Sequence, residues 1–239
     1  LPVYKKAELL NKVADKITSE KERLAEVMTN ETGKPIKLSR IEVDRTIYTF
    51  RCGAEESRRI DGEIISIDQL PGAENKMGLI KRFPIGVILA ITPWNFPMNL
   101  VAHKLSPALA SGNTVLLKPS SASIVSGIEI VKIIKEVSDD MNLGYSPVNV
   151  VACSGNDIEK FVNDDRVKLV SFTGSPAVGW NLKKNLSMQR ISLELGGNAG
   201  VIVDESADLN FAAEKIASGA FNHAGQSCIS VQRVFVHKN

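Results

Sequence analysis

Residues 86–97 read GVILAITPWNFP, and this segment predicts the centre of the fold. Its first half, Val87–Ile91, is an apolar, β-branched run of the length of a buried strand. Pro93 and Pro97 follow it, and because proline cannot donate to a strand ladder, the chain must leave the sheet there. The stretch therefore predicts a buried strand that ends in a rigid turn.

Similar apolar runs recur along the chain, separated by helical segments. The further runs are Thr114–Leu117, Val148–Val151, Leu169–Phe172 and Val201–Val203. Helical stretches near 98–110, 122–137 and 207–223 separate or flank several of them. Continuous apolar strands that alternate with helices indicate a mostly parallel sheet covered on both faces. The predicted fold class is α/β, doubly wound, with ligands at the carboxyl ends of the strands.

The segment before residue 86 reads differently. Apolar residues at helical spacing are Leu10, Val13, Ala14, Ile17 and Leu24. Gly33 and Pro35 predict the end of this helix, and a second amphipathic stretch covers 36–59. Glu63–Ile67 and Met77–Phe83 look like two strands joined by a polar turn, which predicts a projecting hairpin.

Composition and charge exclude several classes of function. The 239 residues are 44% hydrophobic and 23% charged, with a net charge of +2 and no basic stripe, so we expect no nucleic-acid partner. No apolar run approaches the ~20 residues of a membrane helix, so we expect no membrane partner. Three cysteines without CxxC spacing predict no disulfide framework and a cytoplasmic location. The three histidines lie far apart, which predicts no metal site.

The two ends of the chain suggest a piece of a larger protein. The sequence starts at Leu1, not Met, and residues 230–236 alternate like a strand at the very end. We expect further residues beyond that strand.

Asn95 stands between the two prolines, directly after the strand. A side-chain amide held rigidly can donate a hydrogen bond to a developing oxyanion. The alternative is that Asn95 only caps the helix that follows.

Two other strand ends suit a nucleotide. Lys118, ahead of Ser120 and Ser121, suits a ribose or phosphate group, or simply reaches solvent. The glycine turn 174–179 opens a helix, and a helix start with free N–H groups favours an anion such as a pyrophosphate. An ordinary strand-to-helix turn explains the same pattern.

Glu194 and Cys228 complete the candidate set. Glu194 lies in an apolar strand, and its burial would raise the pKa of the carboxyl towards that of a general base. Cys228 follows a small polar loop, where a thiolate would be a nucleophile. The alternative for Cys228 is a buried structural thiol.

Taken in order, these motifs resemble the aldehyde dehydrogenase superfamily, of the NAD(P)-dependent, non-acylating type. The matching segments are PWNFP at 93–97, LKPS at 117–120, FTGS at 172–175, LELGGN at 193–198 and GQSC at 225–228. The resemblance covers essentially the whole chain. It implies a Rossmann-like cofactor domain followed by the beginning of an α/β catalytic domain.

The resemblance also implies a chemistry. Cys228 attacks an aldehyde to form a thiohemiacetal, whose oxyanion is held by Asn95 and by the backbone N–H of the cysteine. Hydride passes to NAD or NADP, and Glu194 activates the water that hydrolyses the thioester to a carboxylic acid.

The implied cofactor contacts lie on five segments. They are Thr92, Pro93, Trp94, Lys118, Ser120, Ser121, Gly155, Gly174, Ser175 and Gly196. Many NAD-preferring members carry a glutamate where this chain has Ser121, so we expect NADP to be accepted. The loop 152–155 keeps only one of two usual glycines, which puts the adenine pocket in doubt.

The implied organisation has four parts: a helical part at 1–60, a hairpin oligomerisation arm at 61–83, a dinucleotide-binding core at 84–197, and the start of a catalytic domain at 198–239. The family chain is about twice as long, so whether this chain alone is active stays open.

We expect a homo-oligomer, a dimer or tetramer, and a small-molecule aldehyde substrate whose identity the sequence does not reveal. The alternatives are a CoA-acylating aldehyde dehydrogenase and a nucleotide-binding fragment without catalysis.

Overall fold

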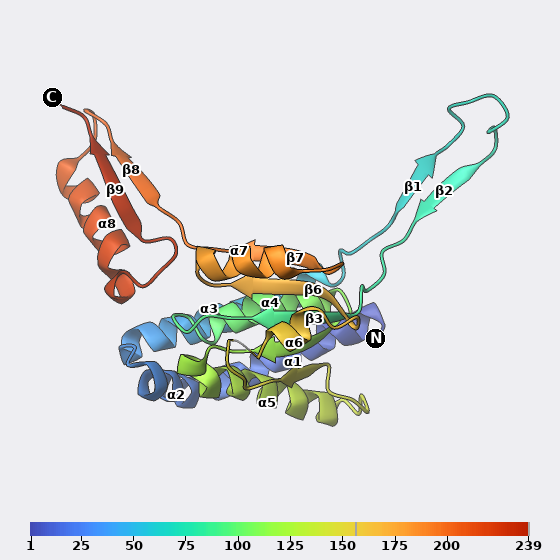
Figure 1. The fold of residues 1–239 in the computed structure, drawn as a ribbon, viewed down its shortest axis with the longest axis horizontal. Helices are drawn as coiled ribbons and strands as arrows, with labels where there is room; N and C mark the ends of the chain where they lie inside the picture. Colours follow the sequence, from blue (N-terminus) through green and yellow to red (C-terminus); the bar gives the residue numbers. More distant parts are fainter. Residues whose placement is uncertain (156, 239) are drawn as a thin grey trace.

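A computed structural model describes residues 1–155 and 157–238. Its centre is a five-stranded parallel sheet in the order β5-β4-β3-β6-β7 (Figure 1). The strands are β3 (Val87–Ile91), β4 (Thr114–Lys118), β5 (Val148–Val150), β6 (Val167–Thr173) and β7 (Arg190–Glu194). This is the doubly wound α/β fold expected from the sequence, and the predicted limits of β3 are confirmed.

Helices cover both faces of the sheet because its strands alternate their side chains between two cores. Ile88 and Ala90 of β3 belong to one core, and Leu89 and Ile91 belong to the other. The helices that follow the strands are α4 (Asn99–Ala110), η1 (Ser121–Ser123), α5 (Ile124–Asp140), α6 (Glu159–Val162) and α7 (Pro176–Asn185). The larger core also takes in the N-terminal helices, and α6 and α7 supply the smaller one.

The N-terminal part holds three helices, α1 (Val3–Ser19), α2 (Lys21–Thr32) and α3 (Ile36–Glu56). The single helix expected before Gly33 is therefore wrong: it is broken at Glu20, where φ is −107° and ψ is 14°. Gly33 ends α2 with a left-handed φ of 71°, as the Gly-Pro spacing predicted. The buried stripe of α1 includes Leu10, Val13 and Ile17.

The expected hairpin is present but shorter. Strands β1 (Glu63–Ser66) and β2 (Met77–Ile80) pair antiparallel, with Ile64 opposite Leu79. They project away from the sheet, as Figure 1 shows in cyan. Ile64 is 70% exposed and Leu79 is 75% exposed, so the arm presents apolar surface to solvent.

The last segment is a separate βαβ unit. Strand β8 (Ala199–Val203) pairs in parallel with β9 (Val231–Val236) through α8 (Leu209–Phe221) and the short helix η2 (Asn222–Gly225). The unit stands beside the main body rather than extending its sheet (Figure 1). Within residues 1–155 and 157–238, the helices are too short or too polar to cross a membrane.

Candidate active site

The candidate site lies where the strand order changes direction. From β3 the chain builds outward through β4 to β5, and it then returns to the other side of β3 with β6 and β7. Parallel sheets bind ligands at the carboxyl ends of their strands beside such a point. Asn95 follows β3 there, and Gly174 and Ser175 follow β6.

Asn95 contacts the loop that carries the cysteine. Its Nδ2 donates to the backbone oxygen of Gln226 at 2.8 Å, and its Oδ1 accepts from the N–H of Phe96 at 3.2 Å. The two contacts fix which end of the amide is the donor. The alternative that Asn95 caps the next helix is wrong, because the free N–H groups of Met98 and Asn99 at the start of α4 bind the Glu42 carboxylate instead.

The loop that carries Cys228, residues 222–230 and here called the cysteine loop, is tightly folded. Three consecutive residues, His223, Ala224 and Gly225, have φ values of 51°, 56° and 73°. Such left-handed backbone is unfavourable for the two residues that are not glycine, so surrounding contacts must hold it. Cys228 follows this turn and is exposed, so the alternative of a buried structural thiol is wrong.

His223 anchors the loop to the Asn95 segment. Its ring lies 6.3 Å from the Trp94 ring and 5.4 Å from the Phe96 ring, measured between centroids. Its Nε2 is buried without a hydrogen-bond partner among the described residues. Burial lowers the pKa of His223, and the nearby Lys34 charge lowers it further. The imidazole therefore favours its neutral form at this junction.

Glu194 is exposed, so the expectation that it is buried is wrong. It ends β7, which is an edge strand of the sheet. Ile191 and Leu193 pack on the smaller core, whereas Glu194 points from the opposite face into a cleft. The apolar residues of β7 do pack on a core, but only one face of the strand is covered, and Glu194 lies on the other face.

This cleft brings two candidate residues together. It has a volume of about 1470 Å³, and its lining includes Cys228, Glu194 and Lys104. A thiol and a carboxylate therefore face the same space. Within the described residues, no group of three or more His, Cys, Asp or Glu is placed to hold a metal ion.

Lys104 is a residue of this cleft that the sequence analysis missed. It lies on α4, is only 7% exposed, and donates from Nζ to Ser171 Oγ at 3.1 Å. Burial lowers the pKa of Lys104 to about 8, while the charge of Glu194 raises it. The helix α4 is largely apolar and is buried on nearly all sides. A lysine inside such a helix is the signal that could have identified Lys104.

The expected cofactor residues also gather at the carboxyl edge of the sheet. Thr92, Pro93 and Trp94 follow β3; Lys118, Ser120 and Ser121 end or follow β4; Gly155 follows β5; Gly174 and Ser175 follow β6; and Gly196 follows β7. Two of them have unused polar groups. Thr92 Oγ1 is buried with no hydrogen-bond partner among residues 1–155 and 157–238. Lys118 is 8% exposed, and its ammonium has no partner in the same residues.

The start of α7 is shaped for a close approach. Ser175 is the N-cap, and its Oγ accepts from the N–H of Val178 at 3.4 Å. A Cβ on Gly174 would come within 2.5 Å of the Phe172 ring, so only glycine fits there without a shift. Gly196 has open space, since a Cβ would meet nothing closer than Pro176 at 3.7 Å.

Comparison with known proteins agrees with this geometry. The family model "Aldehyde dehydrogenase family" matches residues 1–239. A 3-sulfolactaldehyde dehydrogenase of Priestia aryabhattai is 41% identical over 237 residues, which are 99% of this chain and 49% of that protein. The chain thus spans about half the length of the curated relatives it matches.

Two solved structures superpose closely. One is aldehyde dehydrogenase 21 from Physcomitrella patens in complex with the reaction product succinate, with a TM-score of 0.93, 38% identity, and coverage of 100% of this chain and 49% of that one. The other is the glyceraldehyde-3-phosphate dehydrogenase GapN from Methanocaldococcus jannaschii complexed with NADP, with a TM-score of 0.93, 38% identity, and coverage of 100% and 51%. By sequence and by fold, this chain belongs to the aldehyde dehydrogenase family.

Proposed function

We propose that this chain supplies the cofactor site and the nucleophile of an enzyme that oxidises an aldehyde to a carboxylic acid with NAD⁺ or NADP⁺. The observation that carries the proposal is the 2.8 Å hydrogen bond from Asn95 Nδ2 to Gln226, two residues before Cys228. It joins an oxyanion donor from the sheet to the loop of the nucleophile. Membership of the family supports the same activity.

Cys228 is the nucleophile. Its sulfur forms a bond to the aldehyde carbon, and the carbonyl electron pair moves onto oxygen. The Asn95 amide has two hydrogens, one of which Gln226 holds, so the second is free to donate to that oxyanion. The backbone N–H of Cys228 is the second proposed donor.

Glu194 is the base for release of the product. It takes a proton from a water molecule that attacks the thioester carbon, and the carbon–sulfur bond breaks to return the thiolate. Its place in the cleft that Cys228 also lines supports this role, because a water molecule can reach it there.

The residues at the carboxyl edge of the sheet fit a dinucleotide. A dinucleotide held there would supply the hydride acceptor, so that oxidation of the thiohemiacetal would leave a thioester on Cys228. Lys118 and Thr92 offer the unused polar groups, and the start of α7 at Ser175 suits a pyrophosphate. Ser121 is exposed and neutral, so it does not repel a 2′-phosphate. We expect NADP to be used, and a strict preference for NAD in steady-state kinetics would contradict this.

The relatives suggest a small polar aldehyde as substrate. Their names specify sulfolactaldehyde and glyceraldehyde 3-phosphate, and one was solved with succinate. The cleft carries more basic than acidic side chains, including Arg45, Lys104 and Arg190, which favours an anionic group on the substrate. A panel of neutral and anionic aldehydes tests this, and higher kcat/KM for the neutral ones would contradict it.

Two alternatives are separated by one set of assays on the natural polypeptide that carries this chain. Cys228→Ala should abolish aldehyde oxidation and retain dinucleotide binding, whereas the control Cys52→Ala, on α3 outside the proposed sites, should keep both. A binding-only protein would show no oxidation that depends on Cys228. If added CoA yields an acyl-CoA product in place of the free acid, the acylating alternative is correct.

A homo-oligomeric assembly and a cytoplasmic location are also proposed. The exposed apolar side chains of the β1–β2 arm support a contact between subunits. Light scattering of the polypeptide with and without residues 61–83 tests this, and an unchanged mass would contradict it. The divisions at 60, 83 and 197 rest on the sequence pattern and the resemblance, and the cytoplasmic location rests on the cysteine usage.

A further inference from the structure

A buried ion pair lies behind the Asn95 segment. Lys34 stands between α2 and α3, and Glu42 lies on α3. The side chain of Lys34 is 1% exposed and that of Glu42 is 2% exposed, and the Lys34 ammonium contacts the Glu42 carboxylate directly. Two charges are costly to remove from water, so a pair this deeply buried needs further hydrogen bonds.

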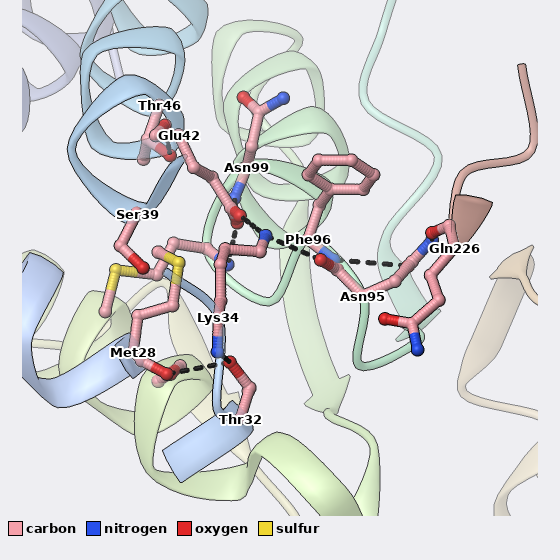
Figure 2. Close-up of polar contacts among 12 residues, drawn as sticks. Met28, Thr32, Lys34, Ser39, Glu42, Thr46, Asn95, Phe96, Asn99 and Gln226 are labelled. Carbon is pink, nitrogen blue, oxygen red and sulfur yellow. Dashed lines mark hydrogen bonds and ion pairs between the residues drawn. The ribbon is translucent and has the colours of Figure 1, made fainter. Parts of the chain in front are cut away.

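Those further hydrogen bonds all go to the segment that carries Asn95 (Figure 2). Lys34 Nζ donates to the backbone oxygen of Asn95 at 2.6 Å. Glu42 Oε1 accepts from the N–H groups of Met98 at 3.0 Å and Asn99 at 3.1 Å. The Lys34 ammonium also lies 4.2 Å from the centre of the Phe96 ring.

The two side chains bind different parts of the Asn95 segment. Glu42 satisfies free N–H groups at the start of α4, where the residue at the N-cap position, Met98, makes no side-chain cap. Lys34 holds the carbonyl of Asn95 three residues earlier. The segment is thereby fixed at two points by one charged unit from a distant part of the chain.

The consequence falls on the Asn95 side chain. With its backbone held from one side, the amide reaches the other way to Gln226 in the cysteine loop (Figure 2). A chain of contacts therefore runs from Glu42 through Lys34 and Asn95 to the residues before Cys228. A shift of the Asn95 carbonyl would move the amide away from the oxyanion position.

We propose that Lys34 and Glu42 are positioning residues that aim the Asn95 amide at the oxyanion formed on Cys228. This inference rests on the proposed function and adds two residues to it. The competing explanation is that the pair only stabilises the fold. It predicts that the loss of kcat in a double-mutant cycle is the same with and without Asn95.

The test is a cycle between Lys34 and Asn95 in the natural polypeptide. Lys34→Met should lower kcat for aldehyde oxidation about 10- to 100-fold, the effect of misplacing one oxyanion donor, with the KM for the dinucleotide within about two-fold. In the Asn95→Ala background, the same change should lower kcat by less than about three-fold, because its target is already gone.

Matched controls come from a second ion pair that also joins α2 to α3. Lys21 and Asp44 lie 2.6 Å apart, but their side chains are 33% and 56% exposed, and neither contacts the Asn95 segment. Lys21→Met and Asp44→Asn should keep wild-type kcat, whereas Lys34→Met and Glu42→Gln should not. If Lys34→Met does not fold, Glu42→Gln replaces it in the cycle, since the amide keeps the shape of the carboxylate.

The outcomes separate the two proposals. Wild-type kcat in Lys34→Met, or an equal loss with and without Asn95, overturns the positioning role while Cys228 remains the nucleophile. Retention of oxidation by Cys228→Ala overturns the proposed function, whatever the Lys34 variants do.

Discussion

At the scale of single residues, Lys104 is a buried charge of the cleft that titrates near neutral pH. It lies on α4 and donates a hydrogen bond to Ser171, and the charge of Glu194 also acts on it. Burial disfavours the ammonium and lowers the pKa of Lys104 to about 8. The charge of this face of the cleft therefore changes in a pH range where enzymes are commonly assayed.

This gives a pH-dependent stability. The folded-state pKa lies below the ordinary value of 10.5, so the cost of Lys104 is fully present below pH 8 and disappears as the pH rises towards 10.5. The free energy of unfolding of the wild type, relative to Lys104→Met, should rise by about 2 kcal/mol between pH 7.5 and 9.5. Urea unfolding of both proteins measures it. The same difference should be nearly constant from pH 6 to 7, and a flat difference up to pH 9.5 would contradict the burial of the charge.

At the scale of elements, the turn from β6 to α7 decides whether a dinucleotide can approach. Phe172, one residue before the end of β6, lies in the smaller core, and its ring fills the space where a Gly174 side chain would be. Ser175 then begins α7. The turn thus couples core packing to the shape of the proposed pyrophosphate site.

Gly174→Ala should therefore damage both properties. Displacing the Phe172 ring should cost about 1–3 kcal/mol of stability, as overpacking does. Dinucleotide binding, followed by fluorescence titration, should weaken as well. Gly200→Ala on β8 is the control, because a Cβ there makes only ordinary contacts, the nearest with the Phe235 ring at 3.4 Å, and β8 lies outside the proposed cofactor site. Equal effects of the two substitutions would show that the Phe172 contact is unimportant.

Local pattern was enough to predict most elements but not their environment. Val87–Ile91 and the hairpin could be read from the sequence because apolar runs, glycine and proline act locally. The exposure of Glu194 could not, since it depends on β7 being an edge strand with one uncovered face. The left-handed turn at His223 carries no local signal, because tertiary contacts hold it.

At the scale of the whole molecule, segments far apart in sequence meet at Asn95. The α2–α3 junction holds its backbone, and the βαβ unit at the end of the chain receives its side chain. Order along the sequence could predict Asn95, Glu194 and Cys228 as candidates, through resemblance. It could not predict the Lys34–Glu42 pair, whose effect depends on a contact across 61 residues from Lys34 to Asn95.

Whether Cys228 carries the acyl group can be measured by trapping that group on the natural polypeptide. Glu194→Gln should slow hydrolysis of the thioester, so aldehyde and NADP⁺ should give a burst of about one NADPH per site, as expected for an accumulating acyl-enzyme. Peptide mass spectrometry after an acid quench should then find the acyl group on Cys228. An acyl group on another residue, or steady oxidation by Cys228→Ala at the wild-type rate, would contradict the account.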